Sequence, residues 1–157
     1  MIKGKTIKFG DNVDTDQIIP AQYLSQSTIQ QMAAHTFEFY ENFTKDFIPG
    51  DIICGNDNFG CGSSREQAPA VLKERGVSAV IARSFARIFY RNAINLGLFP
   101  VECERADEIR HGDVLEIDTK KGIIKNITSD SSLEITPLPP FMQEILNCGG
   151  IVKSKKV

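Results

Sequence analysis

The stretch Asp51–Cys103, DIICGNDNFGCGSSREQAPAVLKERGVSAVIARSFARIFYRNAINLGLFPVEC, decides the fold of this chain. Short apolar runs alternate in it with longer mixed segments. The apolar runs are 51–54, 77–82 and 98–103, and the mixed segments are 64–76 and 83–97. Continuous apolar runs are typical of strands buried on both faces, and each mixed segment ends in a glycine suited to a left-handed helix cap. The pattern predicts a βαβαβ unit with a parallel sheet.

The segments on either side of this unit favour antiparallel strands. GKTIKFG at 4–10 and the long run 113–138 have strand and turn patterns, and a last helix is expected within 139–150. Residues 23–49 are polar and aromatic and predict no definite element. We therefore expect an α/β fold in one domain, residues 1–157, with a central parallel βαβαβ unit and flanking antiparallel strands.

Composition narrows the class of protein. The chain has 157 residues, 41% of them hydrophobic and 24% charged, which suits one globular domain with a real core. A net charge of −2 gives no electrostatic reason to expect nucleic acid or a membrane surface as partner. We see neither an apolar run of transmembrane length nor a signal-peptide pattern, so we expect a cytoplasmic protein.

The cysteines and histidines predict no metal site. The four cysteines are spaced widely and irregularly, at Cys54, Cys61, Cys103 and Cys148. This spacing matches neither a disulfide framework nor a zinc or iron–sulfur ligand set, and only two histidines accompany them. We expect reduced thiols and no metal bound by this chain.

The loop GCGSSREQAP at 60–69 allows two interpretations. The structural one is a helix start, because Ser63 followed by Glu66 fits a capping box. Pro69 fits this poorly, since it would lie beyond the first turn and remove a hydrogen bond to Arg65. The loop is therefore expected to have irregular geometry.

The functional interpretation is an anion site. The loop follows a parallel strand at its carboxyl end, where open α/β sheets bind ligands, and Arg65 offers a planar fork for a carboxylate or phosphate. Phosphate-loop and dinucleotide motifs fail here, and no nucleophile elbow is present. If Ser63 does chemistry, its surroundings must activate it, and a helix N-terminus beside a guanidinium would do so.

Two further polar clusters carry less information. Asp11, Asp14 and Asp16 are read as solvated turn acids, because their spacing lacks the glycine and glutamate of a calcium loop. Arg83, Arg87 and Arg91 recur every four residues, so we expect them on one helix face, either solvated, paired with acids on a neighbouring element, or at a partner interface.

Three segments together carry a family resemblance. GDNVDTDQIIPAQYL, GDIICGNDNFGCGSSREQAP and IARSFARIFYRNAINLGLFPVEC, in this order, resemble the small subunits of 3-isopropylmalate dehydratases. These are swivel-domain members of the aconitase superfamily. The resemblance implies a single swivel-type β/β/α domain and a hydro-lyase activity.

That family also implies a reaction, a cofactor and a partner. Its members interconvert 2-isopropylmalate and 3-isopropylmalate by dehydration and rehydration in leucine biosynthesis. A separate large subunit carries a [4Fe-4S] cluster, which acts as Lewis acid on the departing hydroxyl. By resemblance, this chain binds no cofactor itself and is inactive without the large subunit.

The resemblance also assigns residues. Ser63 is implied as the base that removes the proton next to a carboxylate, and Arg65 with the amide of Ser64 as the groups that bind substrate. Asp16 matches the swivel-domain aspartate of the TD motif, which faces the site.

The substrate is argued from charge. No arginine precedes Arg65, and the loop with Gln22, Tyr23 and Leu24 is neutral, which favours an alkyl-substituted malate over a tricarboxylate. Gln22 stands where many family members have arginine. Alternatives remain: the small subunit of 2,3-dimethylmalate dehydratase or homoaconitase, or a stand-alone anion- or nucleotide-binding module.

Overall fold

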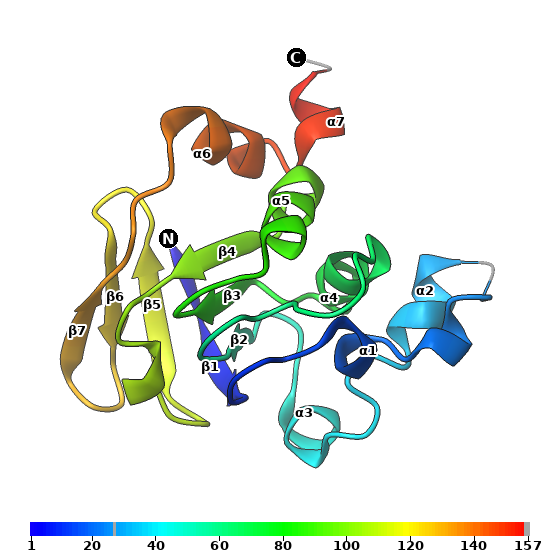
Figure 1. Ribbon diagram of the computed structural model, residues 1–157. Helices are drawn as coiled ribbons and strands as arrows, with labels where there is room; N and C mark the ends of the chain where they lie inside the picture. Colours follow the sequence, from blue (N-terminus) through cyan, green and yellow to red (C-terminus); the bar gives the residue numbers. More distant parts are fainter. Residues whose placement is uncertain (27, 156–157) are drawn as a thin grey trace.

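The computed structural model describes residues 1–26 and 28–155. Its centre is a seven-stranded sheet with the strand order β4-β3-β2-β1-β5-β6-β7 (Figure 1). The strands are β1 (Ile2–Lys8), β2 (Ile52–Cys54), β3 (Ala79–Ala82), β4 (Phe99–Glu102), β5 (Val114–Asp118), β6 (Ile123–Asn126) and β7 (Ser131–Glu134).

The parallel half of the sheet confirms the predicted βαβαβ unit. Strands β2, β3 and β4 pair in parallel, with Ile53 opposite Val80 and Val80 opposite Pro100. All residues of β2 and β3 are buried, because layers cover both faces of these strands. Their carboxyl ends lie at one edge of the sheet, and the loops that leave this edge build the site described below.

Strand β1 corrects one prediction. The segment 4–10 was expected in an antiparallel flank, but β1 lies in the middle of the sheet. It pairs in parallel with β2 and antiparallel with β5. The other flank is as predicted, since β5, β6 and β7 form an antiparallel meander.

The helices lie mainly on the side of the parallel strands (Figure 1). They are α1 (Thr15–Ile18), α2 (Ile29–Ala33), α3 (Glu41–Asp46), α4 (Gln67–Arg75), α5 (Arg87–Leu96), α6 (Pro140–Asn147) and α7 (Ile151–Ser154), with short 3₁₀ turns η1 (Ala21–Tyr23) and η2 (Ala106–Glu108). Gly76 and Gly97 end α4 and α5 with φ of +92° and +82°, as predicted. The unassigned segment 23–49 contains α2 and α3. None of the helices in the described ranges is long and apolar enough to cross a bilayer.

The start of α4 differs from the prediction. The helix begins at Gln67, its N-cap Glu66 makes no side-chain cap, and the expected Ser63–Glu66 capping box is absent among the described residues. Pro69 is thus the third residue of α4. Helix N–H groups have no intrahelical acceptor there, so the proline removes no hydrogen bond. Residues 62–66 form the irregular loop that the proline had indicated.

The start of α5 is also later than predicted, at Arg87 instead of Arg83. Residues 83–86 pair with the chain around Phe59: its N–H donates to the Ser84 carbonyl at 3.0 Å, and its carbonyl accepts from Ala86 at 2.9 Å. Arg83 therefore does not share a helix face with Arg87 and Arg91, and the predicted stripe of three is wrong.

Two apolar clusters pack on opposite faces of the sheet. On one face Ile53 and Val80 pack with α1, α2, α4 and α5. On the other face Ile52 and Ile81 pack against Ile117 of β5, because the meander curls over the parallel strands. Both clusters consist of buried side chains, so the carboxyl ends of β1–β4 are a rigid support for the loops.

Candidate active site

The glycine-rich loop lies against the turn that follows β1. The Gly60 N–H donates to the Val13 carbonyl at 2.7 Å, and the Thr15 N–H donates to the Cys61 carbonyl at 2.8 Å. Asp14 and Cys61 form an isolated parallel bridge. Two segments about 45 residues apart, GCGSSR and VDTD, are thus joined by backbone bonds.

Gly62 makes this close approach possible. Its φ is +93°, and a Cβ there would lie 2.5 Å from Oδ2 of Asp14 and 2.7 Å from its Cγ. That carboxylate caps α1, accepting the Asp16 N–H at 2.7 Å, and the Gln17 side chain completes a capping box. A side chain at position 62 would therefore disturb the helix that carries Asp16.

Ser63 has a fixed backbone and a free hydroxyl. Its carbonyl accepts from the Thr15 hydroxyl at 2.9 Å and from the Arg65 N–H at 2.8 Å. The residue is exposed, and its hydroxyl has no hydrogen-bond partner among residues 1–26 and 28–155. The hydroxyl is thus available to a ligand.

Arg65 is the most constrained of the predicted residues. Its Nη1 lies 3.2 Å from Oδ1 of Asp16 and 3.0 Å from the Ile19 carbonyl. The Arg65 side chain is only 16% exposed, whereas Asp16 is 62% exposed. Asp16 also accepts the Ala21 N–H at 3.0 Å, which links α1 to η1. The structure therefore brings Asp16 and Arg65 into contact.

A cavity of about 340 Å³ opens beside the loop. It is lined by Thr15, residues 60–65 and residues 86–89. Ser63, Ser64 and Arg65 share this cavity. Asp16 is not among the lining residues and reaches it only through Arg65.

The first turn of α5 lines the same cavity, which sequence reasoning missed. Arg87 begins the helix, and its N-cap Ala86 provides no side-chain acceptor. The first N–H groups of α5 therefore remain unsatisfied within the helix, and with the guanidinium of Arg87 they favour an anion. The anion-favouring helix terminus expected at Ser63 thus belongs to α5. The error came from placing the helix start at Arg83.

The segment with Gln22, Tyr23 and Leu24 does not line this cavity. Tyr23 stacks on His35 with ring centroids 3.7 Å apart, and both side chains hydrogen-bond Glu38. The bond to Glu38 raises the pKa of Tyr23, and the same bond lowers the pKa of Glu38. Leu24 packs on the core, which leaves Gln22 as the exposed member of the three.

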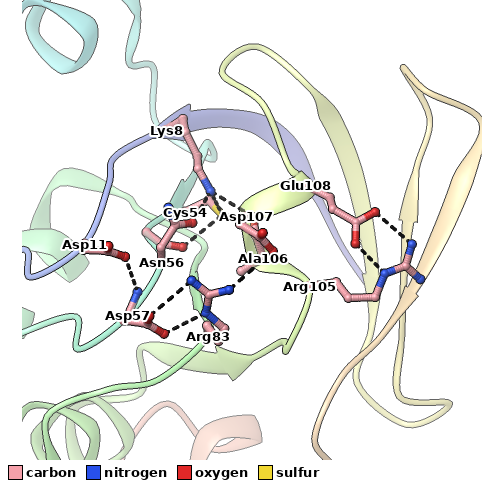
Figure 2. Close-up of polar contacts among 11 residues, drawn as sticks. Lys8, Asp11, Cys54, Asn56, Asp57, Arg83, Arg105, Ala106, Asp107 and Glu108 are labelled. Atoms are coloured by element: carbon pink, nitrogen blue, oxygen red, sulfur yellow. Dashed lines mark hydrogen bonds and ion pairs between the residues drawn. The ribbon is translucent and has the colours of Figure 1, made fainter.

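An ion-pair network around Arg83 joins the segments that follow β1, β2 and β3 to the turn η2 (Figure 2). Arg83 binds Asp57 in a bidentate manner, with Nε 2.7 Å from Oδ1 and Nη2 3.2 Å from Oδ2. A second amino group of Arg83 lies 3.7 Å from Asp107 of η2, and the Asp57 N–H donates to Asp11 at 3.0 Å. The bond to Asp57 raises the pKa of Arg83. Arg83 thus pairs with acids on neighbouring segments, which was one of the expected alternatives. Asp11 is an exposed turn acid, as predicted, and also accepts a backbone hydrogen bond.

Lys8 fills the adjoining interior position. Its Nζ lies 2.8 Å from Oδ1 of Asn56 and 2.8 Å from the Ala106 carbonyl, and 3.4 Å from the Cys54 sulfur (Figure 2). Burial raises the pKa of Cys54 to about 11 despite this ammonium. The thiol is therefore neutral and unreactive at physiological pH.

The described residues do not fit an iron–sulfur cluster. Within residues 1–26 and 28–155, no group of three or more histidine, cysteine or acidic side chains is arranged so that it could hold a metal ion. Cys54 and Cys103 are fully buried in the core, and all four cysteines are free. A cluster needs several thiolates around one site, which this arrangement does not offer.

Known proteins match this chain over nearly its whole length. The aconitase C-terminal domain family matches residues 3–106. The 3-isopropylmalate dehydratase small subunit of Wolinella succinogenes is 52% identical, covering 98% of this chain and 93% of its own. Small subunit 1 of the same enzyme from Archaeoglobus fulgidus is 49% identical, covering 98% and 96%. The crystal structure of a 3-isopropylmalate dehydratase from Methanocaldococcus jannaschii superposes with a TM-score of 0.93 at 47% identity, covering 99% and 93%. The resemblance in the motifs is confirmed: the chain belongs to the aconitase C-terminal domain family and, within it, to the 3-isopropylmalate dehydratase small subunits.

Proposed function

We propose that this chain is the small subunit of a cytoplasmic hydro-lyase that interconverts 2-isopropylmalate and 3-isopropylmalate in leucine biosynthesis. The observation that carries the proposal is the match of about half of all residues to named small subunits, with nearly complete coverage in both directions. We also propose that residues 1–157 form one aconitase-like swivel domain.

In this proposal Ser63 is the base. Its hydroxyl stands free in the cavity, while its carbonyl is held by Thr15 and Arg65. Deprotonated Ser63 would take the proton from the carbon next to a substrate carboxylate as the hydroxyl leaves the neighbouring carbon, and would return a proton during rehydration. The fixed backbone supports this role, because proton transfer requires a positioned oxygen.

Arg65 and the Ser64 amide would bind the carboxylate next to that carbon. Negative charge builds on this carboxylate as the proton leaves, so a guanidinium and an N–H aimed at it stabilise the transition state. Asp16 would orient Arg65, whose contacts with Asp16 and the Ile19 carbonyl leave its other amino group for substrate. Arg87 lines the same cavity and would contact a second carboxylate of the substrate.

A large subunit is part of the proposal. The described residues bring no histidine to the cavity, so a second acid–base group has to come from elsewhere. The part of the chain that the structure describes offers no ligand set for the [4Fe-4S] cluster expected for this chemistry, so we assign the cluster to the large subunit. We therefore propose that the chain turns over substrate only in the heteromer.

The experiment measures which substrate the reconstituted complex prefers, and then how the loss of the Ser63 hydroxyl changes turnover. The chain is mixed anaerobically with its cluster-loaded large subunit, and turnover of 2-isopropylmalate, 2,3-dimethylmalate and homocitrate is measured. We expect 2-isopropylmalate to be preferred. Preference for either of the others would assign a sister hydro-lyase, and nucleotide binding by the isolated chain would instead favour the stand-alone module.

In the same assay, Ser63→Ala should lower kcat by about 10³-fold, within the range of general-base catalysis. Ser132→Ala, at an exposed serine of β7, is the matched control and should match wild type. Assembly of both variants with the large subunit should be unchanged. A Ser63→Ala complex with kcat within a few fold of wild type would refute the assigned role.

A further inference from the structure

A second cavity, of about 350 Å³, lies outside the site, between α5, α6 and α7. These three helices contact one another at one end of the molecule (Figure 1). The cavity is mainly apolar, with Tyr90 and Ile94 from α5, Phe141 and Ile145 from α6, and Ile151 from α7. We call it the helix groove.

Each of the three helices that form the helix groove carries an exposed apolar side chain, and one of these, Phe141, lines the groove. Phe141 is 61% exposed, Val152 of α7 is 65% exposed, and Ile88 of α5 is 49% exposed. Single exposed apolar residues are ordinary, but Phe141 is both exposed and part of the lining of an apolar cavity, which is a combination that partners cover.

Charge around the helix groove is positive. The two charged residues that line it are Arg87 and Arg91. Neither makes an ion pair within residues 1–26 and 28–155. The other charged residues on these helices and their caps are Lys153 and Lys155 of the C-terminal segment and Glu144 on α6, and Glu102 of β4 acts electrostatically on Tyr90. A partner segment with acidic residues beside apolar ones would complement the positive charge at the border of the helix groove.

The helix groove is continuous with the candidate active site. Arg87 lines both cavities, and Ile88 extends from the active-site cavity onto the exposed face of α5. A partner that covers the Ser63 cavity would therefore reach the helix groove across one turn of α5.

We propose that the helix groove is part of the docking surface for the large subunit, which places an apolar segment flanked by aspartate or glutamate there. The inference rests on the proposed function, because that function supplies the partner. A second copy of this chain fits less well: a two-fold contact through the helix groove would bring Arg87 and Arg91 of both copies together.

The test measures the dissociation constant between the full chain and the large subunit. Phe141→Asp should raise Kd by at least about 10-fold, as expected for a buried aromatic anchor. Arg91→Glu should raise Kd and weaken its dependence on salt, because it removes a rim charge. Ile127→Asp is the control, since Ile127 is 45% exposed but lies in the turn before β7. Its Kd should equal that of wild type.

Amide hydrogen exchange on the wild-type complex is the second measurement. We expect new protection in residues 140–155 on binding the large subunit, and kcat of Phe141→Asp at saturating large subunit should equal wild type. Wild-type Kd for both groove variants, or no new protection in 140–155, would overturn the docking proposal. So would an isolated-chain dimer that Phe141→Asp dissociates, because the occupant would then be a second copy.

The docking proposal and the proposed function can fail separately. A complex that protects 140–155 but does not turn over 2-isopropylmalate would refute the function and keep the docking surface. An active complex in which Phe141→Asp and Arg91→Glu both leave Kd unchanged would refute the docking surface and leave the proposed function standing.

Discussion

Gly62→Ala tests how the two site loops are fitted together. The substitution places a Cβ 2.5 Å from Oδ2 of Asp14, in a backbone with φ of +93°. Real Cβ atoms do not approach so closely, so the Asp14 carboxylate must move away. It then loses its hydrogen bond from the Asp16 N–H, which begins α1.

The magnitude has two parts. An alanine in a left-handed conformation costs about 1 to 2 kcal/mol. Losing an aspartate N-cap adds ~1 kcal/mol, so the free energy of unfolding should fall by roughly 2 to 3 kcal/mol. Gly112→Ala is the matched control, because Gly112 has φ of +87° and a Cβ at this position would have no neighbouring atom within 4 Å. Gly112→Ala should lower the free energy of unfolding only by the cost of the left-handed backbone.

Urea unfolding of the isolated chain measures both variants, and a double-mutant cycle isolates the contact. In an Asp14→Ala background, Gly62→Ala should cost no more than Gly112→Ala does in wild type. Equal losses for Gly62→Ala and Gly112→Ala in the wild-type chain would refute the reasoning. So would a coupling free energy of zero between positions 62 and 14.

Three further predictions concern charged and buried groups. Arg65→Lys should lower kcat/KM of the reconstituted complex by about 100-fold, because one ammonium cannot contact Asp16 and also bind a carboxylate in a bidentate manner; near-normal kcat/KM would count against a carboxylate contact. Arg83→Lys loses the bidentate bond to Asp57 and should lower kcat about 10-fold through misplacement of the loop, with KM kept; a KM effect alone would contradict this positioning role. Cys54 has its pKa raised from 9.0 to about 11 by burial, so the folded chain keeps a proton that the unfolded chain loses. The free energy of unfolding should therefore fall as pH rises from 9 to 11, more steeply than in Cys54→Val, and equal slopes would contradict the assignment.

The strands of the parallel unit could be predicted because their signal is local. Ile52, Val80 and Val101 lie in short, continuous apolar runs bounded by turn residues. Such runs are typical of buried strands. The position of β1 could not be predicted in this way. Its pairing with β2 on one side and β5 on the other depends on residues about 45 and 110 positions away, which no local pattern encodes.

The helix starts failed for a related reason. Ser63 and Glu66 satisfy the rule for a capping box, but Ser63 is held by Thr15 from another segment. The backbone of Phe59 likewise forms hydrogen bonds with Ser84 and Ala86, and these bonds keep the two residues out of α5. In both cases long-range hydrogen bonds override a local preference. The motif still placed Ser63, Ser64 and Arg65 in one cavity, because the three residues are neighbours in the chain.

The central position of β1 affects how the protein is made. When the first 102 residues have left the ribosome, β1 can pair with β2, and β3 with β4. The β1 edge that later receives β5 is then still open, and it stays open until Val114–Asp118 has been synthesised. An unpaired edge beside an apolar face is a template for pairing between nascent chains. The nascent chain is therefore most open to pairing with other nascent chains in the interval between the emergence of β4 and the emergence of β5.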